Sequence, residues 1–198
     1  MSLKVGITGG IGAGKSLVSD IFRTFGIPIY NADLMARKFM NEDPGLKEAI
    51  RKTFGQEAYN GGSLNRLFLA QQIFNNEEYL ARINALVHPV VINDYISWLK
   101  DHSDQPYNIK EAALLFESGS YKDLDRIILV LAPKTVRIQR ILMRDAHRTQ
   151  TDVENIIARQ MSDRSKKKLS DYIIINDEQK MVLPQVLEIH RKLLGEVK

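Results

Sequence analysis

Residues 9–16 read Gly-Gly-Ile-Gly-Ala-Gly-Lys-Ser, a glycine-rich run that ends in a lysine and a serine. This order fits the pattern G-x-x-x-x-G-K-[ST], which is typical of loops that bind the phosphates of a nucleoside triphosphate. Glycines carry no side chain that would hold a phosphate away, so the main-chain N–H groups of such a loop can converge on its oxygens. The Lys15 ammonium would pair with the β- and γ-phosphates, and the Ser16 hydroxyl would ligate Mg²⁺.

A phosphate loop needs a strand before it and a helix after it. Lys4 to Thr8 has the pattern of a strand, and Gly14 to Phe25 carries apolar residues at helical spacing. The alternative is a glycine-rich turn that precedes a lysine by chance, and these flanking elements favour the phosphate loop. The residues expected to contact ATP in this loop are Gly9, Gly10, Ile11, Gly12, Ala13, Gly14, Lys15, Ser16 and Leu17.

Asp33 follows the apolar stretch Ile27 to Tyr30, which we expect to form the second strand. Ligands of open parallel sheets bind beyond the carboxyl ends of the strands, so a carboxylate at this position lies where a substrate would. It would orient a substrate hydroxyl, accept its proton, or both. The alternative is that Asp33 caps the helix beginning at Leu34, and the two roles are compatible.

Arg137, Arg140 and Arg144 are spaced by three and four residues, so they share one face of the helix expected from Lys134 to His147. Guanidinium groups bind phosphoryl oxygens in bidentate fashion. A helical segment carrying them, about residues 140–165, would act as a lid that closes over ATP and excludes water. The alternative is a solvated basic face.

Strands that alternate with helices predict an α/β fold with a parallel sheet. We expect a single domain over residues 1–198, a three-layer α/β/α arrangement like that of P-loop kinases, with a core of residues 1–43 and 102–198. An all-helical, substrate-binding insertion would occupy about residues 44–101, with helices at 45–54, 63–75 and 77–100, the last kinked or divided at Pro89. The five expected strands are Lys4–Thr8, Ile27–Tyr30, Tyr107–Phe116, Arg126–Ala132 and Asp171–Ile175, and the later helices are Lys134–His147, Asp152–Arg164 and Glu178–Gly195.

Composition excludes several classes of protein. Apolar residues make up 44% and charged residues 26%, an ordinary balance for a globular chain. The absence of cysteine excludes disulfides, thiolate nucleophiles and cysteine-based zinc sites, and the 4 histidines lack metal-ligand spacing. The longest apolar run, residues 127–132, is far too short to cross a bilayer, so we expect a cytoplasmic protein without a membrane partner.

The motifs of other nucleotide-binding proteins are missing. No Asn-Lys pair and no D-x-x-G occur, which argues against a GTPase. The strand expected after residue 107 contains no aspartate, unlike the strands of motor and helicase ATPases. The small size, the helical insertion and the arginine-rich segment favour a small-molecule kinase.

Several short motifs are spread along the chain: Gly6–Ser16, Asn31–Arg37, Gly62–Arg66, His88-Pro89, Ala113–Glu117, Arg140–Asp145, Gln160-Met161 and Asp171–Asn176. With these motifs the chain resembles the dephospho-CoA kinase family over nearly its whole length. Three positions depart from the family's common residues: Leu17 replaces a threonine, Asn31 an aspartate and Ala113 a proline. Because Asn31 replaces one aspartate of its motif, the resemblance implies that Asp33 is the functional carboxylate there.

The resemblance implies that ATP phosphorylates the ribose 3′-hydroxyl of dephospho-CoA with Mg²⁺ as cofactor. It implies catalytic roles for Asp33, Lys15, Arg140 and Arg144, with Arg140 also contacting ATP and Asn176 lying near its adenine. His88 could equally hydrogen-bond at a helix stop, and Arg37 could form a surface salt bridge. The residues implied in substrate binding are Asp33, Arg37, Arg66, His88, Leu115 and Glu117.

Two rival functions fit parts of the sequence. The first is another P-loop kinase, acting on a nucleoside monophosphate or a small alcohol. The second is a nucleotide switch or a nucleic-acid-binding ATPase, suggested by the net charge of +4 and by Lys166–Lys168. Switch loops are missing, and no aromatic residues alternate with these lysines for base stacking. We therefore expect ATP and dephospho-CoA as partners, no specific nucleic acid, and a monomer or small homo-oligomer.

Overall fold

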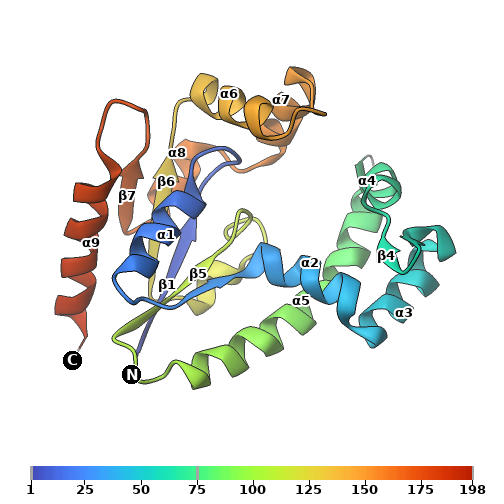
Figure 1. Cartoon of the computed structure of the whole chain (residues 1–198), viewed down its shortest axis with the longest axis horizontal. Coiled ribbons are helices and arrows are strands. Elements are labelled where there is room, and N and C mark those ends of the chain that lie inside the picture. The colour runs from blue at the N-terminus through green and yellow to red at the C-terminus, as the bar shows by residue number, and fades with distance from the viewer. Residues whose placement is uncertain (1, 75, 198) are drawn as a thin grey trace. The chain divides into compact units, whose positions relative to one another are not determined.

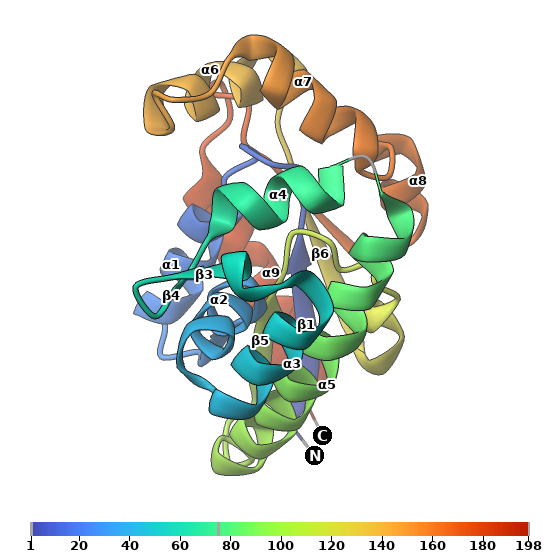
Figure 2. The same ribbon diagram turned by 90° about the vertical axis from the view of Figure 1, so that its right-hand side faces the viewer.

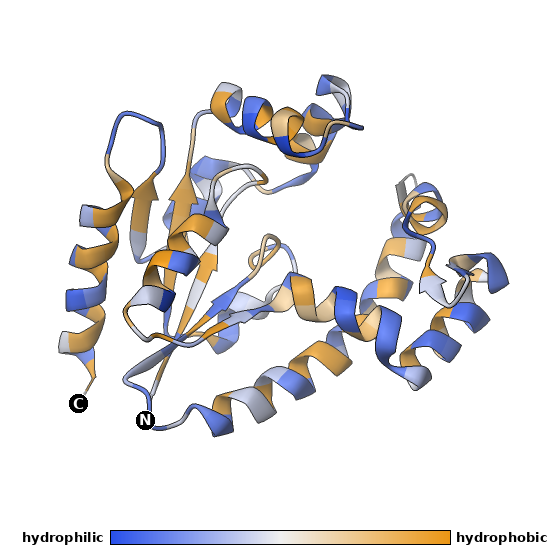
Figure 3. Cartoon of the chain, viewed as in Figure 1, coloured by the Kyte–Doolittle hydropathy of each residue, from blue (hydrophilic) through white to orange (hydrophobic). Residues whose placement is uncertain are grey.

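The computed structural model describes residues 2–74 and 76–197 (Figure 1). One sheet of five parallel strands has the order β2-β5-β1-β6-β7, which confirms the predicted sheet. Strands of a parallel sheet are covered on both faces, which suits the nearly continuous apolar runs of β6 and β7 in Figure 3. The strands are β1 (Leu3–Thr8), β2 (Ile29–Asn31), β5 (Tyr107–Glu111), β6 (Arg126–Leu131) and β7 (Tyr172–Ile175).

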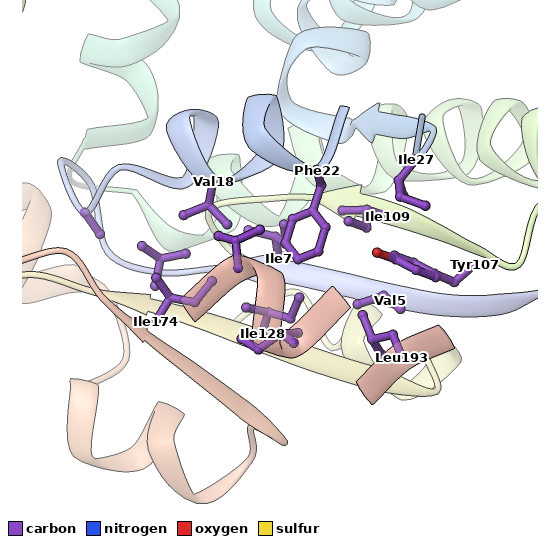
Figure 4. Close-up of a cluster of buried hydrophobic side chains, with 14 residues drawn as sticks. Val5, Ile7, Val18, Phe22, Ile27, Tyr107, Ile109, Ile128, Ile174 and Leu193 are labelled. Carbon is purple, nitrogen blue, oxygen red and sulfur yellow. The ribbon is translucent and has the colours of Figure 1, made fainter. Parts of the chain in front are cut away.

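Helices α1 (Lys15–Thr24) and α9 (Val182–Glu196) cover one face of the sheet. Their apolar side chains contact those of every second strand residue, which point toward this face of the sheet (Figure 4). Phe22 of α1 packs edge-on against Tyr107 of β5, with ring centroids 6.3 Å apart. This packing fixes α1, and with it the position at which the loop after β1 must end.

The segment between β5 and β6 and helix α8 (Asp163–Lys168) lie against the opposite face. A Cβ added to Gly6 would lie 2.7 Å from side-chain carbons of both Leu115 and Leu124. The absence of a side chain at Gly6 therefore lets this segment pack directly on β1. Together the two covered faces confirm the predicted three-layer α/β/α arrangement.

Several predicted boundaries in this part of the chain are wrong. The strand predicted to reach Phe116 ends at Glu111, and turns follow. The single helix predicted over 152–164 is two helices, because Thr149 and Ser162 each cap a separate N-terminus. The last helix begins at Val182 rather than Glu178, after a turn at Asp177. The other helices here are α6 (Lys134–Arg144), α7 (Gln150–Arg159) and the short 3₁₀ helix η2 (Ser120–Asp123).

Residues 32–101 form a second compact unit (Figure 2). Helix α2 (Ala32–Glu42) packs on α5 (Glu77–Asp101) and α3 (Pro44–Phe54), so this unit begins at Ala32 rather than at the predicted boundary of 44. The buried side chains Leu46, Ile50 and Ile83 form part of its core. Helix α4 (Arg66–Phe74) and the 3₁₀ helix η1 (Gln56–Ala58) complete its helices.

The second unit is not all helical, contrary to the prediction. Strands β3 (Tyr59–Asn60) and β4 (Ser63–Leu64) form an antiparallel hairpin around Gly61 and Gly62. Both glycines have positive φ, 55° and 86°, as a two-residue type I′ turn requires. The helix predicted from residue 63 therefore begins at Arg66, and its predicted end, Asn75, lies outside the described residues.

Helix α5 runs from Glu77 to Asp101, so Pro89 does not divide it, and the kink predicted as the other outcome stays a prediction. Proline removes one helical hydrogen bond, but buried Val87 and Val91 on either side anchor both halves of the helix. The alternative that His88 ends a helix is therefore wrong. In the described part of the chain, no helix is apolar over a length sufficient to cross a membrane.

Candidate active site

The glycine-rich loop lies between β1 and α1, as the sequence predicts. Its backbone turns back on itself, since the Ala13 N–H donates to Gly10 O at 3.1 Å. Gly14 then begins α1 in the left-handed conformation, with φ 92°. The first N–H groups of a helix have no partner within it, and its dipole is positive at this end. The loop and α1 thus form a site for an anion of the size of a phosphate.

Neighbouring elements leave no room for side chains in the loop. A Cβ on Gly12 would lie 2.6 Å from the backbone oxygen of Arg137, and one on Gly14 would lie 2.1 Å from Nδ2 of Asn176. Both glycines also have positive φ. Glycine is required at these positions because α6 and the end of β7 lie directly against the loop. A bound phosphate would also have to approach the loop closely.

Replacing Gly12 with alanine tests this close approach. Gly12 and Gly26 have φ of 78° and 79°, but a Cβ at Gly26 would meet no atom within 4 Å. Gly26→Ala is therefore the matched control, with the same strained backbone and no collision. We expect Gly12→Ala to lower kcat/KM for ATP about 100-fold, as a displacement of about 1 Å does. Gly26→Ala should leave kcat/KM unchanged and lower stability by about 1–2 kcal/mol, measured by urea unfolding.

The Lys15 side chain lies over the loop. Its Nζ donates to Gly9 O at 3.0 Å and lies 3.4 Å from Gly10 O. The ammonium therefore stabilises the loop's shape and is held at the position where the outer phosphates of a nucleotide would meet it.

Ser16 has a partner that the sequence did not reveal. Its Oγ donates to Oε1 of Glu111 at 3.1 Å. Glu111 is the last residue of β5, pairs in register with Ile7 of β1, and is only 5% exposed. The sequence analysis takes into account only the absence of aspartate from this strand. Glutamate carries the same carboxylate group, so a glutamate at the end of the strand beside β1 is the sequence signal that indicates a partner for Ser16. A hydroxyl and a carboxylate oxygen are hard ligands that suit Mg²⁺.

Two side chains from distant segments hold the peptide groups of Ile11. Gln160 Oε1 accepts from the Ile11 N–H at 2.9 Å, and Arg137 Nε donates to Ile11 O at 2.9 Å. Arg137 is buried and lies 3.4 Å from the Asp163 carboxylate. Burial lowers the pKa of Arg137, and Asp163 opposes that shift. Arg137, expected on a lid face with the other arginines, is a support of the phosphate loop.

Asn176 and Arg140 form a second support. Asn176 is buried, and its Nδ2 donates to Ala13 O at 2.9 Å while its Oδ1 accepts from Nη2 of Arg140 at 3.2 Å. Arg140 Nη1 is buried and has no hydrogen-bond partner among the described residues. Arg140 also pairs with Glu178 at 3.3 Å, and an anionic ligand in the loop would offer the buried Nη1 the acceptor that it lacks.

Arg144 is directed elsewhere. It makes two hydrogen bonds of 2.9 Å to the Asp145 carboxylate, and its side chain is 65% exposed. This pairing lowers the pKa of Asp145 to about 2. The structure thus brings Arg137 and Arg140 to the loop, but holds Arg144 on the neighbouring aspartate.

Leu115 and Glu117, expected in substrate binding, have structural partners. Leu115 is fully buried over Gly6, so its side chain packs inside the protein, and its expected role in substrate binding stays a prediction. Glu117 Oε1 lies 3.0 Å from the Lys166 ammonium and accepts from the Met161 N–H at 2.9 Å. Leu17, the last residue expected at the loop, is half exposed in the first turn of α1.

The remaining expected site residues belong to the second unit. Asp33 and Arg37 lie in α2 at the i, i+4 spacing that places them on one face, and both are exposed. Arg66 begins α4, and His88 lies within α5. The alternative of a surface salt bridge at Arg37 is not met, since Arg37 forms no ion pair with any residue of 2–74 or 76–197.

Known proteins resemble this chain over nearly its full length. The dephospho-CoA kinase family model matches residues 3–181. A dephospho-CoA kinase of Bacteroides fragilis strain YCH46 is 34% identical, over 96% of this chain and 92% of that protein. One from Acinetobacter baylyi is 36% identical, over 96% and 98%. The crystal structure of TT1252 from Thermus thermophilus has a TM-score of 0.85 at 29% identity, over 100% and 98%. The dephospho-CoA kinase of Campylobacter jejuni, 23% identical with a TM-score of 0.71 over 98% of both chains, shares the fold.

Proposed function

The chain belongs to the dephospho-CoA kinase family, and we propose that it transfers the γ-phosphoryl group of ATP to the ribose 3′-hydroxyl of dephospho-CoA, the last step of coenzyme A biosynthesis. The bond between the 3′-oxygen and the γ-phosphorus forms while the bond between that phosphorus and the β–γ bridging oxygen breaks. ADP leaves, and the hydroxyl proton passes to a base.

One observation carries the nucleotide part of this proposal. The main-chain turn of residues 9–14, the Lys15 ammonium and the unsatisfied Nη1 of Arg140 belong to one compact unit and present positive charge around one loop. Such preorganised donors stabilise the charge on a transferring phosphoryl group, because they need no reorganisation when the charge develops. Ser16 and Glu111 would hold Mg²⁺, which neutralises phosphate charge when bound.

The acceptor part rests on Asp33 and on family membership. Asp33 follows Asn31, the last residue of β2, by two positions, and Asn31 pairs in register with Glu111. We assign Asp33 the role of orienting the 3′-hydroxyl and accepting its proton. Arg37, Arg66 and His88 are assigned to the phosphates and arm of the acceptor, and Asn176 to the vicinity of adenine. Arg144 would assist Arg140 only after leaving Asp145.

A coupled assay of ADP release tests the acceptor. With ATP and Mg²⁺ present, we expect dephospho-CoA to raise ADP release far above the rate without an acceptor. AMP, a nucleoside and shikimate should each give kcat/KM lower by about 10⁴-fold or more, because groups built for one substrate remain unpaired with another. Equal turnover of AMP or shikimate would assign the chain to another kinase activity. Product analysis should place the new phosphate on the 3′-oxygen.

A further inference from the structure

Lys166 has no part in the proposed chemistry, yet its ammonium is completely buried. Its side chain is 0% exposed, and Glu117 provides its single charged partner within the described residues, at 3.0 Å. A buried ammonium is costly unless it is paired, and replacing such a pair with apolar residues is often neutral for stability. Stability alone therefore gives no reason for this ion pair.

The ion pair is connected to the start of α8. The same carboxylate oxygen of Glu117 that meets Lys166 also accepts a hydrogen bond from the Met161 N–H, at 2.9 Å. Met161 lies between α7 and α8, outside both helices. Glu117 thus fixes the backbone at the junction of these two helices.

The residue before Met161 is Gln160, which holds the Ile11 N–H. A shift of the Met161 peptide moves Gln160 directly, because the two share a peptide bond. We propose that Glu117 and Lys166 are positioning residues, which act through Met161 and Gln160 to set the conformation of the phosphate loop. The path joins the segment after β5, the junction of α7 and α8, and the loop after β1, all within one compact unit.

This role makes the affinity for ATP depend on residues that do not touch the nucleotide. Arg137 fixes the carbonyl of Ile11 and Gln160 fixes its N–H, so both ends of this residue are held. Loss of the Gln160 contact would let the loop adopt other conformations, and ATP would then have to select one of them.

The test is a double-mutant cycle on the dissociation constant for ATP. The first change is Glu117→Leu with Lys166→Met, which removes both charges and leaves no unpaired buried ion. The second is Gln160→Met, which keeps the length of the side chain but not the acceptor. We expect each change to weaken ATP binding about three- to tenfold, the effect of one hydrogen bond. The combined variant should bind ATP no more weakly than the weaker-binding of the two single changes, because both changes interrupt the same series of contacts to Ile11.

Glu196 provides the matched control. It also joins a cation and a second donor, since it pairs with Arg126 at 2.8 Å and accepts from the Tyr172 hydroxyl at 2.5 Å. Arg126 and Tyr172 begin β6 and β7, at the opposite ends of the strands from the phosphate loop. Glu196→Leu with Arg126→Met should leave ATP affinity unchanged, and its combination with Gln160→Met should match Gln160→Met alone.

Hydrogen exchange at Ile11 supplies an independent readout. Without nucleotide, Gln160→Met and the Glu117–Lys166 replacement should both speed exchange of the Ile11 amide, and the Glu196 control should not. Effects on ATP affinity that multiply in the combined variant, or unchanged Ile11 exchange in the Glu117–Lys166 replacement, would overturn the proposal. If the double replacement does not fold, Lys166→Met alone enters the same cycle, since Glu117 is 20% exposed and can be hydrated.

The inference rests on the proposed function only for the choice of ATP as the ligand. The cycle measures nucleotide binding without any acceptor, so failure to phosphorylate dephospho-CoA would leave its outcome intact. Conversely, an additive cycle in an enzyme that phosphorylates dephospho-CoA would reject the positioning role alone.

Discussion

Replacing Lys15 with methionine is expected to lower kcat by about 100- to 1,000-fold, the effect of removing one preorganised donor at a developing charge. Methionine keeps an unbranched apolar stem but has no group to meet the phosphates. It also removes the hydrogen bond to Gly9 O, so we expect weaker ATP binding in addition. Turnover of ATP and dephospho-CoA measures the first effect, and calorimetric titration with ATP measures the second.

Arg23→Met is the control for this change. Arg23 is a cation on the same helix, but it lies in the last turn of α1 and pairs on the surface with Asp20. Its loss should leave kcat and ATP affinity unchanged, since surface ion pairs contribute little. A Lys15→Met enzyme with near-normal kcat, correctly folded by circular dichroism, would remove Lys15 from the mechanism.

Replacing Asp33 with asparagine is expected to reduce kcat by about 10²- to 10⁴-fold, the usual contribution of a general base. Asparagine has nearly the same shape, and Asp33 is an exposed residue inside the first turn of α2 rather than its cap, so α2 should form normally. The affinity for ATP should change by no more than about twofold, as for a surface substitution. Measuring kcat and the ATP dissociation constant separates the two effects.

Asp43→Asn is the matched control in the same unit. Asp43 caps α3 by accepting from the Leu46 N–H at 2.7 Å, and asparagine can take over this bond. The control should therefore retain full turnover. If Asp33→Asn also retained turnover, the assignment of the base would be wrong, although the nucleotide site would stand.

The phosphate loop owes its conformation to groups outside it as well as to its own glycines. Ile11 is held by Arg137 and Gln160, and Ala13 by Asn176. These three side chains come from α6, from the junction of α7 and α8, and from the end of β7. The arginine-rich segment therefore supports the loop through Arg137, whereas the contact of Arg140 with ATP stays a proposal.

Local patterns were sufficient to predict the sheet and the phosphate loop. Alternating apolar strands and helices, and the order of glycines before Lys15, are read within a few neighbouring residues. The hairpin at Gly61 and Gly62 lies between two predicted helices, 45–54 and 63–75, where the sequence analysis predicts no strand, although two adjacent glycines are typical of a type I′ turn. Pro89 does not divide α5, because packing on both sides of it outweighs one lost hydrogen bond.

The sequence by itself determined the parallel sheet, the phosphate loop and the presence of Asp33 after the second strand. Only the tertiary structure brought Glu111 to Ser16, Arg137 and Gln160 to Ile11, and Lys166 to Glu117. The first three of these contacts join residues 95, 126 and 149 positions apart. No local pattern encodes such contacts, because they arise from the order of the strands in the sheet and from the packing of helices on it.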